Sequence, residues 1–476
     1  MSNTIQLKIW AIVIACGINL ANSAAQQRPN IIFLLADDLG WGDLSCYGNA
    51  KIATPNIDAL AQRGTLFTHY YQSSPVCSPS RTGLMTGRFP ASLRVHTALE
   101  NQPAGNREKG CVDFLDPNTP TVTRLLQENG YVTAHFGKWH LGATADAPPP
   151  STYGISVERT GNSNTTNKLP KADRSASSKT IIDEVIQFVE AYKAEPFYVN
   201  SWFFDVHAIL EPSQEQLDAV KHLGISDRVP FYSPAQIYYG TLRELDIQVG
   251  RLVKKLEELG LLDNTLVIFS SDNGPEDIDV INASHSGVGS AGPFRGRKRS
   301  LYEGGIRVPF IVSWPGHVPT GRVDEENIIG GVDFLPTICA IAGVSVPQDQ
   351  AFDGEDRSAC LFGETAARRK PLFWEWRYGV PGHLMHKSPT LSVRDGRWVF
   401  LMNHDGSRRE LYDIVADPME MSNLADQQAD IAQKLAAQLA HWQRSLPPTK
   451  DIKTAGKRIY PWPEGMGKVS NTSYDQ

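Results

Sequence analysis

Short apolar runs alternate along the chain with longer segments in which apolar residues recur at helical spacing. The run at residues 30–36 (NIIFLLA) has no polar alternation, which is typical of a strand buried on both faces of a parallel sheet. Further strands are predicted at 131–136, 197–204 and 265–270. Helices are predicted between them, at 56–61, 119–129, 181–193 and 237–259. This alternation indicates a doubly wound α/β fold, a mixed sheet flanked by helices.

The pattern changes after about residue 365. Residues 391–401 alternate like a hairpin that turns at Asp395-Gly396, and 431–446 form an amphipathic helical pattern. We therefore expect a large α/β domain over residues 26–365 and a smaller C-terminal α+β subdomain over 366–448. The tail at 449–476 is rich in Pro, Gly, Lys and Ser and is expected to be loosely held.

The N-terminus has the pattern of an export signal. Lys8 precedes an apolar run at 9–20, which is too short to span a bilayer, and small residues follow up to Ala25. We expect a signal peptide at 1–25 and an exported protein, periplasmic or extracellular. The alternative is a lipoprotein anchored through Cys16, which ends a lipobox-like stretch; cleavage after Ala25 is favoured because the apolar run continues past Cys16. No other stretch is long and apolar enough for a transmembrane span.

The composition and net charge exclude some classes of function. The 476 residues are 41% hydrophobic and 21% charged, as in ordinary soluble proteins. A net charge of −6 argues against a nucleic-acid binder. Removal of the signal would leave an odd number of cysteines, which suggests one thiol with a separate role. The pairing of the others cannot be deduced from the sequence. The five are Cys46, Cys77, Cys111, Cys339 and Cys360.

Polar clusters follow four of the predicted strands. Ligands bind beyond the carboxyl ends of strands in open α/β sheets, so parallel strands would bring these clusters to one edge. The clusters are Asp37-Asp38, Lys138-Trp139-His140, Asp205 with His207, and Asp272-Asn273-Gly274.

Three carboxylates and one amide at this edge form an oxygen-rich set. Asp37, Asp38, Asp272 and Asn273 favour calcium or magnesium over zinc, which prefers nitrogen and sulfur. The alternative is that Asp37 or Asp272 caps a following helix. An adjacent pair such as Asp37-Asp38 favours the metal, because like charges side by side need a cation to offset them.

The segment at 77–88, CSPSRTGLMTGR, carries the most specific chemistry. It matches at every fixed position the signature Cys-x-Pro-Ser-Arg, three free residues, Leu or Met, then Thr-Gly-Arg. With this motif the chain resembles the formylglycine-dependent sulfatases of the arylsulfatase A and N-acetylgalactosamine-6-sulfatase type, within the alkaline phosphatase-like superfamily. The resemblance covers nearly all of the mature chain. It extends over motifs at 28–30, 37–43, 54–58, 137–142, 271–274, 302–309, 410–413 and 417–418.

The resemblance implies a nucleophile and a metal. An exported maturase would oxidise Cys77 to formylglycine (3-oxoalanine), whose hydrated aldehyde attacks sulfur and leaves a sulfated hemiacetal that collapses by elimination. One calcium ion would be held by Asp37, Asp38, Asp272, Asn273 and an oxygen of modified Cys77. Cys77 is also expected to open a helix, whose N-terminus favours an anion.

The same resemblance implies roles for further residues. Arg81 would hold the formylglycine, and Lys138 and Lys298 would clamp the sulfate oxygens. His140 would be the base that drives collapse of the hemiacetal. His207 would be a general acid at the leaving oxygen, together with Lys298.

The chain departs from the family pattern in two places. The family usually has Arg-Gly-Gly-Lys-Gly where this chain has RGRKR at 295–299. Arg297 and Arg299 either belong to a solvated loop or meet further anionic groups of the substrate. The polar residue that follows the Lys-x-His segment in the family could be Ser163 or Asn164.

The expected substrate is a sulfated glycan, a polysaccharide or glycosaminoglycan. The sequence does not fix the sugar, the sulfate position or the oligomeric state. Two alternatives stay open: a phosphate or phosphonate ester hydrolase of the same superfamily, and a non-catalytic glycan-binding protein. The sugar would be read by long loops at 91–111 and 143–178. Side chains of the C-terminal subdomain could also reach the pocket, although tryptophans in such a position are more often part of the core; the candidates are Trp374, Trp376, His383 and His386.

Overall fold

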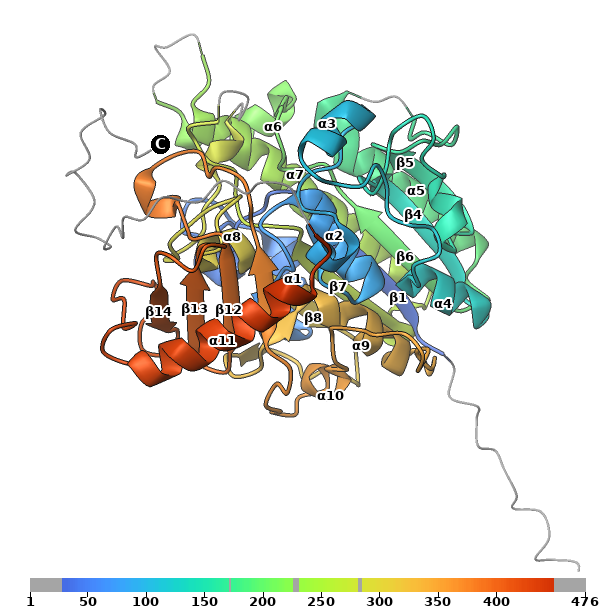
Figure 1. The fold of residues 1–476 in the computed structure, drawn as a ribbon. Coiled ribbons are helices and arrows are strands. Elements are labelled where there is room, and N and C mark those ends of the chain that lie inside the picture. The colour runs from blue at the N-terminus through green and yellow to red at the C-terminus, as the bar shows by residue number, and fades with distance from the viewer. Residues whose placement is uncertain (1–27, 171–172, 226–230, 281–284, 449–476) are drawn as a thin grey trace, which may run out of the picture.

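The computed structural model describes residues 28–170, 173–225, 231–280 and 285–448 (Figure 1). The predicted signal peptide at 1–25, Cys16 and the tail at 449–476 lie outside these residues. Within them, no helix is both long enough and apolar enough to cross a membrane.

A mixed eight-stranded sheet forms the larger part of the molecule. Its strand order is β5-β4-β6-β1-β7-β8-β2-β9. The five strands from β5 to β7 are parallel, and β8 is antiparallel to both β7 and β2. The α/β fold predicted from the sequence is therefore confirmed. The strands are β1 (Asn30–Ala36), β2 (Thr65–Phe67), β4 (Val132–Lys138), β5 (Val157–Gly161), β6 (Phe197–Trp202), β7 (Thr265–Ser271), β8 (Phe310–Ser313) and β9 (Arg322–Asp324).

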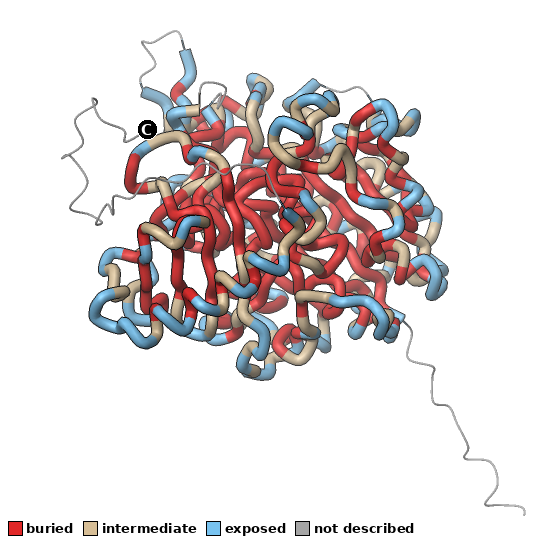
Figure 2. Tube along the Cα trace, viewed as in Figure 1, coloured by how far each residue is buried: buried red, intermediate tan, exposed pale blue. Residues whose placement is uncertain are grey.

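Strand β1 lies at the centre of the parallel part and is fully buried, as its unbroken apolar sequence predicted. Successive side chains point to opposite faces of the sheet. Ile32 and Leu34 join one hydrophobic core, and Ile31, Phe33 and Leu35 join the other. The sheet therefore has a helical layer on each face, and both are buried against it (Figure 2).

The two layers contain the predicted helices. One holds α1 (Pro55–Gln62), α5 (Ser177–Ala191) and α7 (Pro234–Glu258). The other holds α2 (Cys77–Thr86), α4 (Val122–Glu128) and α9 (Phe334–Ile341). The helix predicted at 119–129 starts later than expected, because the Thr121 side chain accepts from the Arg124 amide and caps it there.

A second, antiparallel sheet follows in the chain. It has the order β11-β12-β13-β14, and α11 (Ala429–Ser445) packs across it (Figure 1). The predicted hairpin is confirmed: β12 and β13 pair, with Asp395 opposite Trp398 and Gly396 in the left-handed conformation at φ 60°. The strands are β11 (Leu372–Glu375), β12 (Leu391–Asp395), β13 (Trp398–Met402) and β14 (Glu410–Asp413).

Short elements complete the described chain. Strands β3 and β10 form a two-stranded parallel pair. The short elements are β3 (Tyr70–Tyr71), β10 (Ile329–Gly330), α3 (Pro103–Glu108), α6 (Gln214–Asp218), α8 (Glu303–Ile306) and α10 (Ser358–Leu361). The five cysteines of the described residues are free thiols.

Candidate active site

The four polar clusters predicted from the sequence meet at the carboxyl ends of β1, β4, β6 and β7. Parallel pairing brings the ends together, and backbone bonds continue past the strands. The Asp37 amide donates to the Asp205 carbonyl at 2.9 Å, and the Asp272 amide donates to the Ala36 carbonyl at 3.1 Å. Main-chain hydrogen bonds alone therefore join the loops after β1, β6 and β7.

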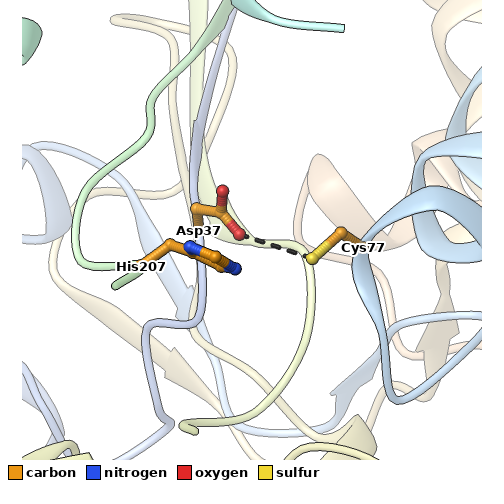
Figure 3. A group of neighbouring side chains, drawn as sticks. All are labelled: Asp37, Cys77 and His207. Carbon is orange, nitrogen blue, oxygen red and sulfur yellow. Dashed lines mark hydrogen bonds between the residues drawn. The ribbon is translucent and has the colours of Figure 1, made fainter. Parts of the chain in front are cut away.

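Cys77 is the first residue of α2, and the whole helix is buried. Its Sγ lies 3.6 Å from Asp37 Oδ1. Figure 3 shows Cys77, Asp37 and the ring of His207 facing one common space, each from a different segment of the chain. An anion in this space would meet the free amides of the α2 N-terminus.

Each of three buried carboxylates has a cationic partner. Lys138 Nζ lies 2.5 Å from Asp37 Oδ2, and Lys298 Nζ lies 2.6 Å from Asp38 Oδ1. Arg81 donates to Asp272 Oδ2 through Nε at 3.0 Å and Nη2 at 2.6 Å.

Arg81 is also held from other directions. Its Nη1 donates to the Lys138 carbonyl at 3.0 Å, and its guanidinium lies over the Trp202 ring. The fork of the arginine therefore connects the carboxylate after β7 to the end of β4, a geometry that the shorter, single-headed lysine cannot reproduce.

Burial and the surrounding charges shift the pKa values of the three carboxylates in different directions. Burial alone would raise the pKa of Asp37, but the nearby cations, Lys138 foremost, hold it far below its usual range. Lys298 in the same way lowers the pKa of Asp38. Burial and the Asp37 charge together raise the pKa of Asp272 to about 6. Asp272 is thus the carboxylate whose charge burial opposes most, although each of the three has a cation beside it.

The donor set fits a hard divalent cation. Ligand atoms of Asp37, Asp38, Cys77 and Asp272 all lie within 4.8 Å of one another. The Asn273 amide donates to Asp38 Oδ1 at 2.7 Å, whereas its buried Oδ1 has no hydrogen-bond partner among the described residues. A buried amide oxygen without a partner is costly unless a cation or water meets it. Carboxylate and amide oxygens are the ligands that calcium prefers.

Two of the site residues have left-handed backbone. Asp38 has φ 62° and His140 has φ 60°. Such a conformation costs a non-glycine residue about 1–2 kcal/mol. At Asp38 the surroundings impose it, because its amide donates to Asp272 Oδ1 at 3.2 Å and the next amide, of Leu39, donates to Ser271 Oγ at 2.9 Å.

The two histidines differ in their surroundings. His140 is half-buried, its Nδ1 has no hydrogen-bond partner among the described residues, and burial and Lys138 hold its pKa well below the usual range. His207 is partly exposed; its Nδ1 donates to the Ala208 carbonyl at 2.6 Å, and its Nε2 lies 3.8 Å from Asp38 Oδ2. Burial and Lys298 lower the pKa of His207. Both rings are therefore held neutral near pH 7.

Several other residues named in the sequence analysis make contacts among themselves or in the core. Ser163 bonds Thr160, and Asn164 donates to the carbonyls of Ala145 and Ala147. Trp374 and Trp376 are buried in the core beside the second sheet, as the more frequent role of such tryptophans predicted. The Trp374 indole donates to the Gln72 carbonyl at 2.7 Å.

Arg297 and Arg299, in the arginine-rich segment at 295–299, make different contacts. Arg297 is not part of a solvated loop, because its guanidinium donates to the carbonyls of Glu276, Gly287 and Gly289. Arg299 instead pairs with the Glu276 carboxylate, which also lies 3.6 Å from Lys298 Nζ.

Two residues of the site were missed by sequence reasoning. Glu276 stands four positions after Asp272, and nothing in its local pattern signals a contact with Lys298. Asp43 lay within a motif, but its role depends on distant partners: it accepts from the Ser290 amide at 2.8 Å and the Tyr238 hydroxyl at 2.7 Å. Asp43 thereby ties the loop after β1 to the loop that leads to Lys298.

Comparison with known proteins identifies the family. Residues 29–344, which include every site residue above, match the family model described as Sulfatase. The chain belongs to the sulfatase family. A second model, "N-sulphoglucosamine sulphohydrolase, C-terminal", matches residues 292–445 of this sulfatase. The protein is accordingly a sulfuric ester hydrolase.

The relatives are similar over most of their length. Human N-acetylgalactosamine-6-sulfatase is 31% identical over 81% of both chains. Human arylsulfatase A is 31% identical, over 84% of this chain and 79% of its own. The N-acetylgalactosamine-6-O-sulfatase of Bacteroides thetaiotaomicron is 28% identical, over 87% of this chain and 93% of its own.

Solved structures share the fold. Ps i-CgsB, solved in complex with k-i-k-neocarrahexaose, superposes with a TM-score of 0.74 and 26% identity, over 88% of this sulfatase and 94% of that chain. The phosphonate monoester hydrolase of Agrobacterium radiobacter superposes with a TM-score of 0.64 at 22% identity, over 88% of this chain and 96% of its own, which is a likeness of fold alone.

We expect the substitution Arg81→Met to destabilise the protein by about 3–5 kcal/mol, because it leaves the Asp272 charge buried without a partner. The matched control is Arg63→Met, since Arg63 pairs with Glu257 at the surface with 46% of its side chain exposed, where loss of a pair costs about 1 kcal/mol or less. Urea unfolding of both variants with chelator present measures the difference. Equal losses would contradict the described role of Arg81.

Proposed function

We propose that this sulfatase hydrolyses sulfate esters on a sulfated polysaccharide or glycosaminoglycan, with formylglycine at position 77 as nucleophile and one calcium ion. The observation that supports this most is the convergence of Cys77 Sγ with three carboxylates within 4.8 Å, flanked by Lys138, Lys298 and Arg81. A nucleophile, a cation site and positive groups for an anion thus share one buried pocket.

The surroundings of Cys77 disfavour the thiol itself as nucleophile. Burial raises its pKa to about 12, so the side chain stays protonated at neutral pH. Oxidation to the aldehyde and hydration would place hydroxyl groups at the same position, beside Asp37 and at the N-terminus of α2. We infer that an exported maturase carries out this conversion and that the protein itself is exported.

Asp37, Asp38, Asp272 and Asn273 would hold the calcium ion together with the modified side chain. When bound, calcium supplies positive charge that polarises the sulfate ester and favours the ionised nucleophile. Its charge would also favour the ionised form of Asp272, whose pKa burial and the Asp37 charge raise. The two candidate ligand groups of the described residues both contain Asp37 and Cys77, so they support one metal and not two.

The remaining residues bind the anion and move protons. Lys138 and Lys298 place buried ammonium groups beside the metal ligands, where they clamp sulfate oxygens. Arg81 holds Asp272 and the end of β4. His140 is neutral and acts as the base, and His207 donates a proton to the leaving oxygen together with Lys298.

The names of the relatives support a sugar substrate. Three of the similar proteins above are named for N-acetylgalactosamine 6-sulfate or were solved with a carrageenan-type oligosaccharide. Phosphonate or phosphate ester hydrolysis is supported only by likeness of fold. A non-catalytic role is disfavoured because the nucleophile, the carboxylates and the cations are all present.

Sulfate release tests this proposal. We expect free sulfate from at least one sulfated mono- or oligosaccharide, a faster rate on an aryl sulfate than on the matching aryl phosphate, and a loss of about a thousandfold or more in Cys77→Ala, because no other group replaces a covalent nucleophile. Chelation should abolish activity and added calcium restore it.

The matched control for that experiment is Cys46→Ala, a half-buried cysteine away from the pocket, which should keep activity. Full activity in Cys77→Ala, or faster cleavage of the phosphate, would overturn the proposal.

The pH profile tests His207. A general acid works in its protonated form, so kcat/KM should fall as the pH rises through its pKa, and the lowered pKa puts the midpoint below about 6.5. We expect His207→Gln to lower kcat about 10²- to 10⁴-fold and to remove this limb. The exposed control His222→Gln should leave the profile unchanged. An alkaline limb that persists in His207→Gln would assign the proton to another group.

A further inference from the structure

Arg299 has a strained backbone at the edge of the pocket. Its φ is 75°, in the left-handed region that costs a non-glycine residue about 1–2 kcal/mol. Main-chain bonds hold it there: the Arg299 amide donates to the Pro75 carbonyl at 3.0 Å, and the Lys298 amide donates to the Pro275 carbonyl at 2.9 Å. The segment is therefore fixed between the residues just before Cys77 and those just after Asn273.

Arg299 adds a second cation beside Lys298. Both of its terminal nitrogens pair with the Glu276 carboxylate, and Lys298 Nζ lies 3.6 Å from the same group and 2.6 Å from Asp38 Oδ1. Lys298 and Arg299 are thus matched by Asp38 and Glu276. An arginine has five N–H donors, and the pair with Glu276 engages one edge of the guanidinium.

Exposure distinguishes Arg299 from the other cations of the pocket. Its side chain is 24% exposed, whereas those of Lys298, Lys138 and Arg81 are 4%, 3% and 0% exposed. The Glu276 carboxylate that Arg299 contacts also lies 3.6 Å from Lys298 Nζ, so the guanidinium lies beside a residue expected to bind the scissile sulfate. Arg297, two positions earlier, is occupied with backbone carbonyls and has no comparable reach.

We propose that Arg299 binds a second anionic group of the substrate, a carboxylate or a further sulfate ester carried next to the sulfate that is cleaved. The inference rests on the proposed function and adds a substrate class to it: glycans with two neighbouring anions. Arginine suits this task because it has five N–H donors, and those that Glu276 does not engage can bind either oxyanion. Glu276 holds the guanidinium in place, and Lys298 is left to bind the scissile sulfate.

The test compares substrates that differ by one anion. The pairs are N-acetylgalactosamine 6-sulfate with its 4,6-disulfate, and the chondroitin 6-sulfate disaccharide with its uronate methyl ester; 4-nitrophenyl sulfate reports on the reaction without a sugar. We expect wild type to prefer the two-anion member of at least one pair. Arg299→Gln should reduce that preference, as a ratio of kcat/KM values, about 10- to 100-fold. Arg299→Lys should reduce it less, because the charge remains and the fork is lost.

Arg397→Gln is the matched control. Arg397 also pairs with one carboxylate through two nitrogens, but that carboxylate is Asp413 of the second sheet, and 50% of the Arg397 side chain is exposed. Its substitution should leave the preference within about twofold, as for a surface change away from the bound anion. The substrate pair whose preference Arg299→Gln reduces shows whether the second anion is a sulfate or a carboxylate.

The outcomes distinguish a failure of the proposed role of Arg299 from a failure of the proposed function. A wild-type enzyme that cleaves these substrates without preference overturns the role of Arg299, as does an equal loss on both members of a pair or a loss of preference in Arg397→Gln. Absence of sulfate release from all of the substrates, with formylglycine verified, contradicts the proposed function itself.

Discussion

The structure depends on one electrostatic constraint, the burial of three carboxylates at the ends of β1 and β7. Asp37, Asp38 and Asp272 are fully buried, and isolated charges could not remain ionised there. Lys138, Lys298 and Arg81 come from three different segments to meet them. The fold therefore has to bring distant parts of the chain together at this point.

The main chain makes that convergence possible. Parallel pairing of β6, β1 and β7 aligns their ends, and backbone bonds lock the following loops in register. Close approach of the strands leaves no room for larger side chains: a Cβ on Gly137 would lie 1.8 Å from the Trp202 carbonyl oxygen. Lys138, the next residue, is thereby set at the floor of the pocket. The same rigidity explains how left-handed backbone at Asp38, His140 and Arg299 is tolerated.

The sequence predicted the parts of this arrangement that depend on local pattern. The four parallel strands, the hairpin at Asp395-Gly396 and the start of α2 at Cys77 follow from apolar periodicity, turn residues and a motif. Spacing alone could not predict contacts between loops. Glu276 meets Lys298 and Arg299 only because both loops lie at one sheet edge. Likewise, the sequence left both the pocket and the core open for Trp374 and Trp376, and the burial of the second sheet places them in the core.

The central claim is that Cys77 is converted to formylglycine, and mass spectrometry of the tryptic peptide that contains it tests this most directly. The protein would be purified from its natural host. Conversion replaces the thiol-bearing carbon with an aldehyde, so we expect a peptide lighter by about 18 mass units than the cysteine form. An unmodified thiol in protein that still releases sulfate would contradict the account.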